Sequence, residues 1–151
     1  MNLGVVGSRD FPSDTLNREM WKLLDRAQAM GFDTVVSGGA RGVDSRAENL
    51  GKGRGMAVIS FRVLDRHDGW FGVEKWIWTP REGWDVWPVM RPRGDRPLAW
   101  SSFGQAAFCR NGLIVDNSDG VVALWDGSSR GTKDSIVRAE WAGNLLEVIL
   151  P

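Results

Sequence analysis

The sequence predicts an α/β fold in three layers, with helices on both faces of a mostly parallel sheet of about five strands. Two observations predict it. Short apolar runs at residues 3–6, 34–37 and 56–61 alternate with stretches that have the periodicity of amphipathic helices. Glycine-containing loops directly follow several of these runs, as they do where a buried parallel strand turns into a helix.

The N-terminal part of the chain has the order strand, helix, strand, helix, strand. The first helix extends from a capping segment at 12–14 to about Gly31, because its apolar residues recur at intervals of three and four. The second helix follows the loop 38–42 and ends at Gly51 and Gly53. Parallel strands need crossover connections, and these helices supply them.

Residues 62–100 interrupt this order and are predicted to be an insertion. They contain four prolines, show no sustained period of 2 or 3.6, and hold six of the nine tryptophans of the chain. Their tryptophan content is too high for a solvated linker, so we expect them to fold over the sheet edge, a partner subunit or a ligand. The six are Trp70, Trp76, Trp78, Trp84, Trp87 and Trp100.

The pattern resumes after the insertion, and residues 1–151 are predicted to form a single domain. A helix capped by Ser102 leads to a core strand at 120–125. A last helix and a strand at 145–150 close the sheet.

Several side chains of the regular elements are expected in the core. Cys109 lies on an alanine-rich predicted helix, where a free cysteine behaves as a small apolar residue. Trp21 and Trp141 lie in predicted helices and are expected to be buried. Trp125 is expected there too, although its place beside a glycine loop would also allow it to stack on a base.

Composition and missing motifs exclude several classes of protein. The 19 basic and 19 acidic residues give a formal net charge of zero, which argues against a general DNA coat. One cysteine and one histidine cannot build a disulfide or a zinc cage, and we predict no metal and no cofactor. The glycine motifs of dinucleotide dehydrogenases, P-loop NTPases and α/β-hydrolases are missing. Without a signal sequence or a long apolar span, the protein is expected in the cytoplasm and not in a membrane.

Three glycine-containing loops, at 7–9, 37–42 and 125–132, follow predicted strands and should meet at one edge of the sheet, where ligands bind. Glycines let the backbone turn tightly and let an anion reach the amides of the next helix. Arginines and hydroxyls in the loops add donors suited to phosphate. We therefore predict a small-anion site with phosphate on the amides of the second and third loops. The predicted ligand-binding residues are Gly7, Ser8, Arg9, Ser37, Gly38, Gly39, Ala40, Arg41, Gly42, Asp44, Arg110, Asn111, Asp126, Gly127, Ser129, Arg130, Gly131 and Thr132.

These segments resemble, in order, the motifs of the SLOG superfamily. The superfamily groups DNA-processing protein A (DprA) with the Lonely Guy (LOG) phosphoribohydrolases and the small YspA-like proteins. The segment Ser-Gly-Gly-Ala-Arg-Gly-Val-Asp at 37–44 is similar to the signature of DNA-processing protein A. The resemblance covers 1–61 and 101–150 and implies a Rossmann-like fold that binds nucleotides or their derivatives at these loops, often as a homodimer.

One departure bears on catalysis. Lonely Guy enzymes pair an arginine of the preceding helix with a glutamate to cleave an N-glycosidic bond. Arg110 is similar to that arginine, but Ser135 stands where the glutamate belongs. No catalytic residue is therefore assigned, and Arg110, Asp126 and Asp134 are the candidates if the protein is an enzyme.

The resemblance and the missing glutamate favour a protein that binds a nucleotide or nucleotide-derived signalling ligand with little or no turnover, as a sensor or sequestering protein and as a homodimer or higher homo-oligomer. Two alternatives stay open. The first is a Lonely Guy-type nucleotide phosphoribohydrolase. The second is a DprA-like single-stranded DNA-binding protein, in which the arginines and tryptophans of 62–100 would stack unpaired bases, although acidic residues interleave with them.

Overall fold

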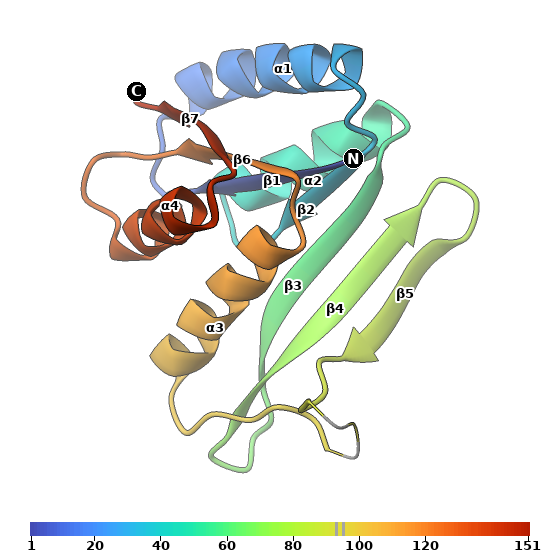
Figure 1. Cartoon of the computed structure of the whole chain (residues 1–151), viewed down its shortest axis with the longest axis vertical. Coiled ribbons are helices and arrows are strands. Elements are labelled where there is room, and N and C mark those ends of the chain that lie inside the picture. The colour runs from blue at the N-terminus through green and yellow to red at the C-terminus, as the bar shows by residue number, and fades with distance from the viewer. Residues whose placement is uncertain (93, 95) are drawn as a thin grey trace.

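The computed structural model describes residues 1–92, 94 and 96–151 and has a single seven-stranded sheet in the order β5-β4-β3-β2-β1-β6-β7 (Figure 1). The parallel strands are β1 (Asn2–Gly7), β2 (Thr34–Ser37), β3 (Ala57–Asp65), β6 (Gly120–Leu124) and β7 (Leu145–Ile149). They correspond to the five predicted strands, and the mixed α/β, Rossmann-like fold is confirmed.

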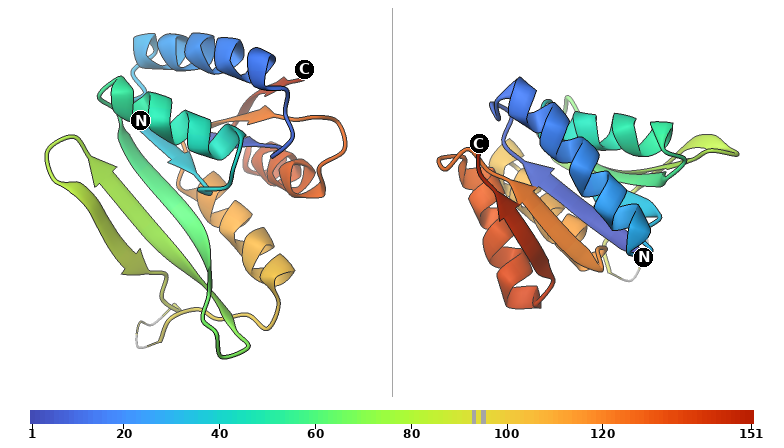
Figure 2. Two further views of the ribbon diagram at one scale, coloured as in Figure 1. Left: turned by 180° about the vertical axis from the view of Figure 1, so that it is seen from behind. Right: turned by 90° about the horizontal axis from the view of Figure 1, so that it is seen from above.

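Helices cover the two faces of the sheet in pairs. Helices α1 (Ser13–Ala29) and α2 (Val43–Gly53) lie on one face, and α3 (Phe103–Asp116) and α4 (Arg130–Ala142) lie on the other (Figure 2). Each pair has its own apolar core, because successive residues of a strand point to opposite faces. In β1, for example, Val5 packs with the core under α1 and α2, whereas Val6 packs with the core under α3 and α4.

Local sequence explains how the helices begin and end. The Ser102 hydroxyl accepts a hydrogen bond from the Gln105 amide at 3.2 Å, which confirms the predicted cap of α3. After α4, Gly143 adopts the left-handed conformation at φ 75°, which stops a helix with little strain. None of the helices among the described residues combines the length and apolar character needed to cross a membrane.

The segment 62–100 contributes a regular element that its sequence does not predict. β3 continues to Asp65, and β4 (Phe71–Thr79) and β5 (Gly83–Pro88) form an antiparallel hairpin on its free edge. The strands escape detection because β4 is apolar on both faces, with Trp76 and Trp78 on one and Val73 and Ile77 on the other, so no alternation shows in the sequence.

Three expectations about the core are wrong. Trp21 is 56% exposed and Trp141 is 88% exposed, because both occupy the solvent side of their helices. Cys109 is also exposed, on the outer side of α3. The apolar stripes that bury α1 and α4 are complete without these side chains, and include Met20 in α1 and Ile136 in α4.

The close approach of β1 to α2 can be tested at Gly7. A Cβ at this position would lie 2.5 Å from the side chain of Val43, which is fully buried at the start of α2. We expect Gly7→Ala to lower the free energy of unfolding by about 1–3 kcal/mol, because strand and helix must move apart. Gly53→Ala is the matched control, since a Cβ there meets open space. Urea unfolding measures both variants, and equal stabilities would contradict this packing.

Candidate functional site

A pocket of about 480 Å³ lies at the carboxyl edge of the sheet, bounded by the loops after β1, β2 and β6 and by the first turns of α3 and α4. The site residues predicted from sequence divide into two groups there. Those that line the pocket are Gly7, Arg9, Ala40, Asp44, Arg110, Asn111, Asp126, Ser129, Gly131 and Thr132. Those outside its lining are Ser8, Ser37, Gly38, Gly39, Arg41, Gly42, Gly127 and Arg130.

The loop between β6 and α4 forms one wall of the pocket. The Asp126 carboxylate accepts hydrogen bonds from the amides of Ser128 and Ser129, both at 2.9 Å, and these donors lower the pKa of Asp126. The Ser129 hydroxyl caps α4 by accepting from the Thr132 amide at 3.4 Å. The Gly131 amide lies in the first turn, where no helical carbonyl can reach it and where the helix dipole favours an anion.

Ser8, the residue directly after β1, contacts this wall on its buried side. Its buried hydroxyl accepts from the Asp126 amide at 3.1 Å and lies 3.4 Å from the Thr132 hydroxyl. Ser8 therefore positions the loop rather than facing the pocket.

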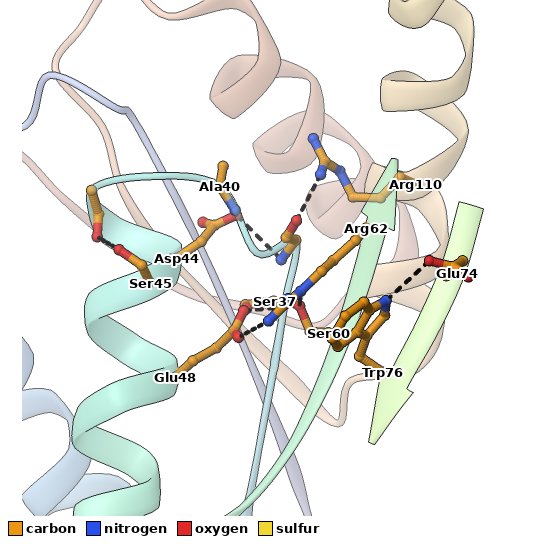
Figure 3. A network of polar contacts seen from close by, with 12 residues as sticks. Ser37, Ala40, Asp44, Ser45, Glu48, Ser60, Arg62, Glu74, Trp76 and Arg110 are labelled. Atoms are coloured by element: carbon orange, nitrogen blue, oxygen red, sulfur yellow. Dashed lines mark hydrogen bonds and ion pairs between the residues drawn. The ribbon is translucent and has the colours of Figure 1, made fainter. Parts of the chain in front are cut away.

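The glycine loop after β2 differs from the predicted phosphate seat, because the chain itself supplies an anion. The amides of Gly38 and Ala40 donate to one carboxylate oxygen of Asp44, at 3.2 and 3.3 Å (Figure 3). Asp44 lies in the first turn of α2, where a carboxylate also complements the helix dipole. These two amides consequently have a partner within the protein.

Two arginines explain why Gly38 and Gly39 lack side chains. A Cβ on Gly38 would lie 2.8 Å from Arg110, whose guanidinium donates to the Gly38 carbonyl at 2.9 Å from the α3 side of the sheet. A Cβ on Gly39 would lie 2.7 Å from the guanidinium of Arg62. Gly39 also has φ 68°, a left-handed conformation that suits glycine. The loop is thus held between Arg110 and Arg62.

Arg62 is fixed by a buried carboxylate. Glu48, one turn after Asp44 on α2, accepts hydrogen bonds from the hydroxyls of Ser37 and Ser60 and forms an ion pair with Arg62 at 3.1 Å (Figure 3). The guanidinium of Arg62 also lies over the indole of Trp76, 4.2 Å from the ring centroid.

Burial sets the charge state of the deepest groups. It raises the pKa of Asp44 to about 6, although Arg110 and the loop amides oppose this rise. It also lowers the pKa of Arg110, an effect that Asp44 offsets and that the nearby charge of Arg9 reinforces. The guanidinium groups of Arg9 and Arg110 therefore lie close to each other at this pocket. Among the described residues, Arg9 has no ion-pair partner.

The pocket also has an apolar wall that the sequence analysis missed. Phe103 and Phe108, from the first turns of α3, line it while remaining 47% and 43% exposed. The Phe103 ring meets Phe71 of β4 edge to face, with 6.0 Å between centroids. The sequence predicts the helix but not which of its turns faces the loops. The other missed lining residues are Val6, Asp10, Gly104, Ala107, Ile114, Ser128 and Ser135.

The three residues considered for catalysis are separated. Arg110 and Asp126 line the pocket, whereas Asp134 does not. The Asp134 carboxylate instead accepts from the Asn111 amide at 3.2 Å and from Arg138 at 2.8 Å. Ser135 lines the pocket with a hydroxyl that donates to the Gly131 carbonyl.

Comparison with known proteins finds a family model that matches the N-terminal part of the chain. Residues 1–64 match the family model of DNA recombination-mediator protein A. A solved structure of DNA processing protein A from Helicobacter pylori, described by its single-stranded DNA binding mode, superposes with a TM-score of 0.63 at 19% identity. The alignment covers 97% of this chain and 64% of that one, so the chain spans less than two thirds of its relative.

Other comparisons add little. An amidase of the nitrilase superfamily from Nesterenkonia aligns over 98% of this chain and 74% of its own, at 13% identity and a TM-score of only 0.34. No curated protein sequence matches the chain significantly.

The raised pKa of Asp44 predicts how stability depends on pH. The folded protein keeps Asp44 protonated up to a pH of about 6, whereas the unfolded chain releases this proton near 3.8. The folded state thus binds more protons between these values, and the contribution of Asp44 to the free energy of unfolding falls as pH rises through them.

Urea unfolding at a series of pH values tests this dependence. Relative to Asp44→Asn, which cannot ionise, we expect the wild type to lose on the order of 2 kcal/mol between pH 4 and pH 6.5. Ser45→Ala, a neighbouring change without a titrating group, should keep the wild-type profile. Parallel profiles for Asp44→Asn and the wild type would refute the raised pKa.

Proposed function

We propose that the protein binds single-stranded DNA, with one nucleotide seated in the pocket; the match of residues 1–64 to the family model of DNA recombination-mediator protein A supports this proposal. The observation that carries the proposal is a pocket that joins two neighbouring arginines to two exposed phenylalanines. A nucleotide has the matching parts, an anionic phosphate and a flat apolar base. The Helicobacter pylori structure, which shares the fold, is described as binding single-stranded DNA.

Arg9 is the residue that we propose to bind phosphate. It lines the pocket from the loop after β1, without an ion-pair partner among the described residues. A phosphate between Arg9 and Arg110 would relieve the repulsion of these two cations. The free amide of Gly131 at the start of α4 would add a donor from the opposite wall.

The base would stack on the aromatic wall. Phe103 and Phe108 line the pocket and are partly exposed to solvent, and a base that stacks on them must first leave its own stack. This requirement favours a single strand over a duplex. A formal net charge of zero further implies contact with few phosphates, and hence a shallow dependence of affinity on salt.

A free nucleotide or nucleotide derivative is the second candidate ligand. The pocket volume of about 480 Å³ is in the range of small-ligand sites, and the carboxylates of Asp10 and Asp126 in its lining can accept hydrogen bonds from ribose hydroxyls. The protein would then be a sensor or sequestering protein in the cytoplasm, as a homo-oligomer. Mass spectrometry of small molecules released on denaturation tests this candidate, and light scattering gives the oligomeric state.

A phosphoribohydrolase is favoured less. Such an enzyme places a carboxylate at the anomeric centre. Asp134 is engaged by Asn111 and Arg138 outside the pocket lining, and Asp126 is engaged by two backbone amides. Release of ribose 5-phosphate from nucleoside monophosphates would support this alternative if Asp126→Ala abolished it.

The experiment for the main proposal is fluorescence anisotropy with a labelled oligothymidylate of twelve nucleotides. We expect Arg9→Ala to weaken binding about tenfold, since it removes a charged hydrogen bond to phosphate. The slope of log affinity against log salt should also fall by about 0.7, as expected for one phosphate contact on a single strand. Arg18→Ala, on the exposed side of α1, is the matched control and should bind like the wild type.

Two results would decide against the proposal. Absence of binding by the wild type at low salt would exclude single-stranded DNA as the ligand. Equal affinities of the Arg9→Ala and Arg18→Ala variants would place the phosphate elsewhere. Displacement of the oligonucleotide by a stoichiometric amount of nucleoside monophosphate would favour the free nucleotide.

A further inference from the structure

The β4–β5 hairpin carries a row of aromatic and apolar side chains on the face of the sheet that α2 borders. Strand register pairs Trp78 with Trp84 and Trp76 with Val86, which places these four side chains on one face. We call them the aromatic face. Trp84 and Val86 are 37% and 39% exposed, and every residue of β5 after Gly83 is exposed. The hairpin extends beyond the helices that cover the rest of the sheet (Figures 1 and 2).

Two cations border this row. The ammonium group of Lys52, at the end of α2, lies 4.7 Å from the ring centroid of Trp84 and 5.7 Å from that of Trp78. The guanidinium of Arg62 lies 4.2 Å from Trp76 and 5.1 Å from Trp84. Trp76 and Trp84 also contact each other edge to face, with 5.7 Å between centroids. The indoles are therefore held in fixed orientations, with positive charge beside them.

The aromatic face and the pocket are connected through the loop at Gly38 and Gly39. Arg110 packs against Gly38, and Arg62 packs against Gly39. Arg110 lines the pocket, and Arg62 contacts Trp76 and Trp84. A nucleic-acid strand that left the pocket across this loop would pass Arg110 and then Arg62.

We propose that the aromatic face is a second contact for single-stranded nucleic acid, on which bases adjacent to the nucleotide in the pocket stack. This inference rests on the proposed function and extends it from one nucleotide to a longer strand. Exposed aromatic side chains on a sheet are a stacking platform that accepts any base, because every base has a π-face. Lys52, which forms no ion pair among the described residues, supplies a charge complementary to the phosphates that would pass beside the indoles.

A second copy of the chain is the competing occupant. Glu74 accepts a hydrogen bond from the Trp76 indole and Glu48 pairs with Arg62, so this face has no strong net charge. The cations nevertheless sit at the ring faces and the loop leads to the pocket, so the arrangement fits a strand better. The test therefore also measures the oligomeric state of the protein.

Trp84→Ala is the informative variant, because this indole is exposed and does not belong to either buried core. Anisotropy is measured with labelled thymidylates of twelve nucleotides and of one nucleotide, the shorter of which occupies the proposed pocket alone. We expect about tenfold weaker binding of the longer oligonucleotide, as for loss of one stacking aromatic residue, and unchanged binding of the shorter one. Trp84→Phe should restore most of the affinity. Trp141→Ala, an exposed tryptophan near the end of α4, is the matched control.

The outcomes separate this inference from the proposed function. If the wild type binds neither ligand, the proposed function and the inference about the aromatic face are both overturned. If it binds the longer one and Trp84→Ala binds it equally well, only the aromatic face is overturned. If Trp84→Ala weakens binding of both ligands equally, the aromatic face is also overturned, because the indole would then support the pocket. If the variant has a lower oligomer mass and unchanged affinity, the aromatic face is overturned too, because the indole would then form a subunit contact.

Discussion

Two buried carboxylates on α2, one helical turn apart, organise the carboxyl edge of the sheet. Asp44 accepts from the glycine-loop amides and lies close to Arg110. Glu48 accepts from Ser37 at the end of β2 and from Ser60 within β3, and it pairs with Arg62. Buried charges cost several kcal/mol unless they are paired and hydrogen-bonded. The loop, the serines and the arginines must therefore keep their places for the carboxylates to be accommodated. The pocket lies on one side of this network and the hairpin on the other.

The same network explains how an electrically neutral chain presents to the pocket an arginine, Arg9, that has no ion-pair partner among the described residues. The carboxylates of Asp10, Asp44 and Asp126 line the pocket beside it. Most of the charged groups at this edge are used within the protein: Arg62 pairs with Glu48, and Arg110 binds the Gly38 carbonyl. Arg9 is left facing the pocket, close enough to Arg110 to affect its pKa. The charge that Arg9 presents thus arises from where the partners lie and not from an excess of basic residues. A few unpaired charges at defined positions select a ligand that matches them, whereas a large net charge attracts any polyanion.

The sequence predicts the parallel part of the fold well, because its signals are local. Short apolar runs, capping residues such as Ser102 and glycines such as Gly31 each specify their own element. It also predicts that the three loops meet at one edge. It does not predict that Asp44 fills the anion seat of the glycine loop, since phosphate and carboxylate satisfy the same amides. The role of Phe103 is equally hidden, because it depends on how α3 is rotated against the sheet.

The pairing of β1 with β6 has a consequence for the order of assembly. β1 occupies the middle of the sheet, and Leu3 pairs with Gly120 in neighbouring β6. During synthesis β1 is made well before β6, so one of its edges stays open until β6 has left the ribosome. Contacts so distant in sequence close slowly, because a long loop must be ordered first. The hairpin of β4 and β5, whose partners are close in sequence, can form long before the centre of the molecule is complete.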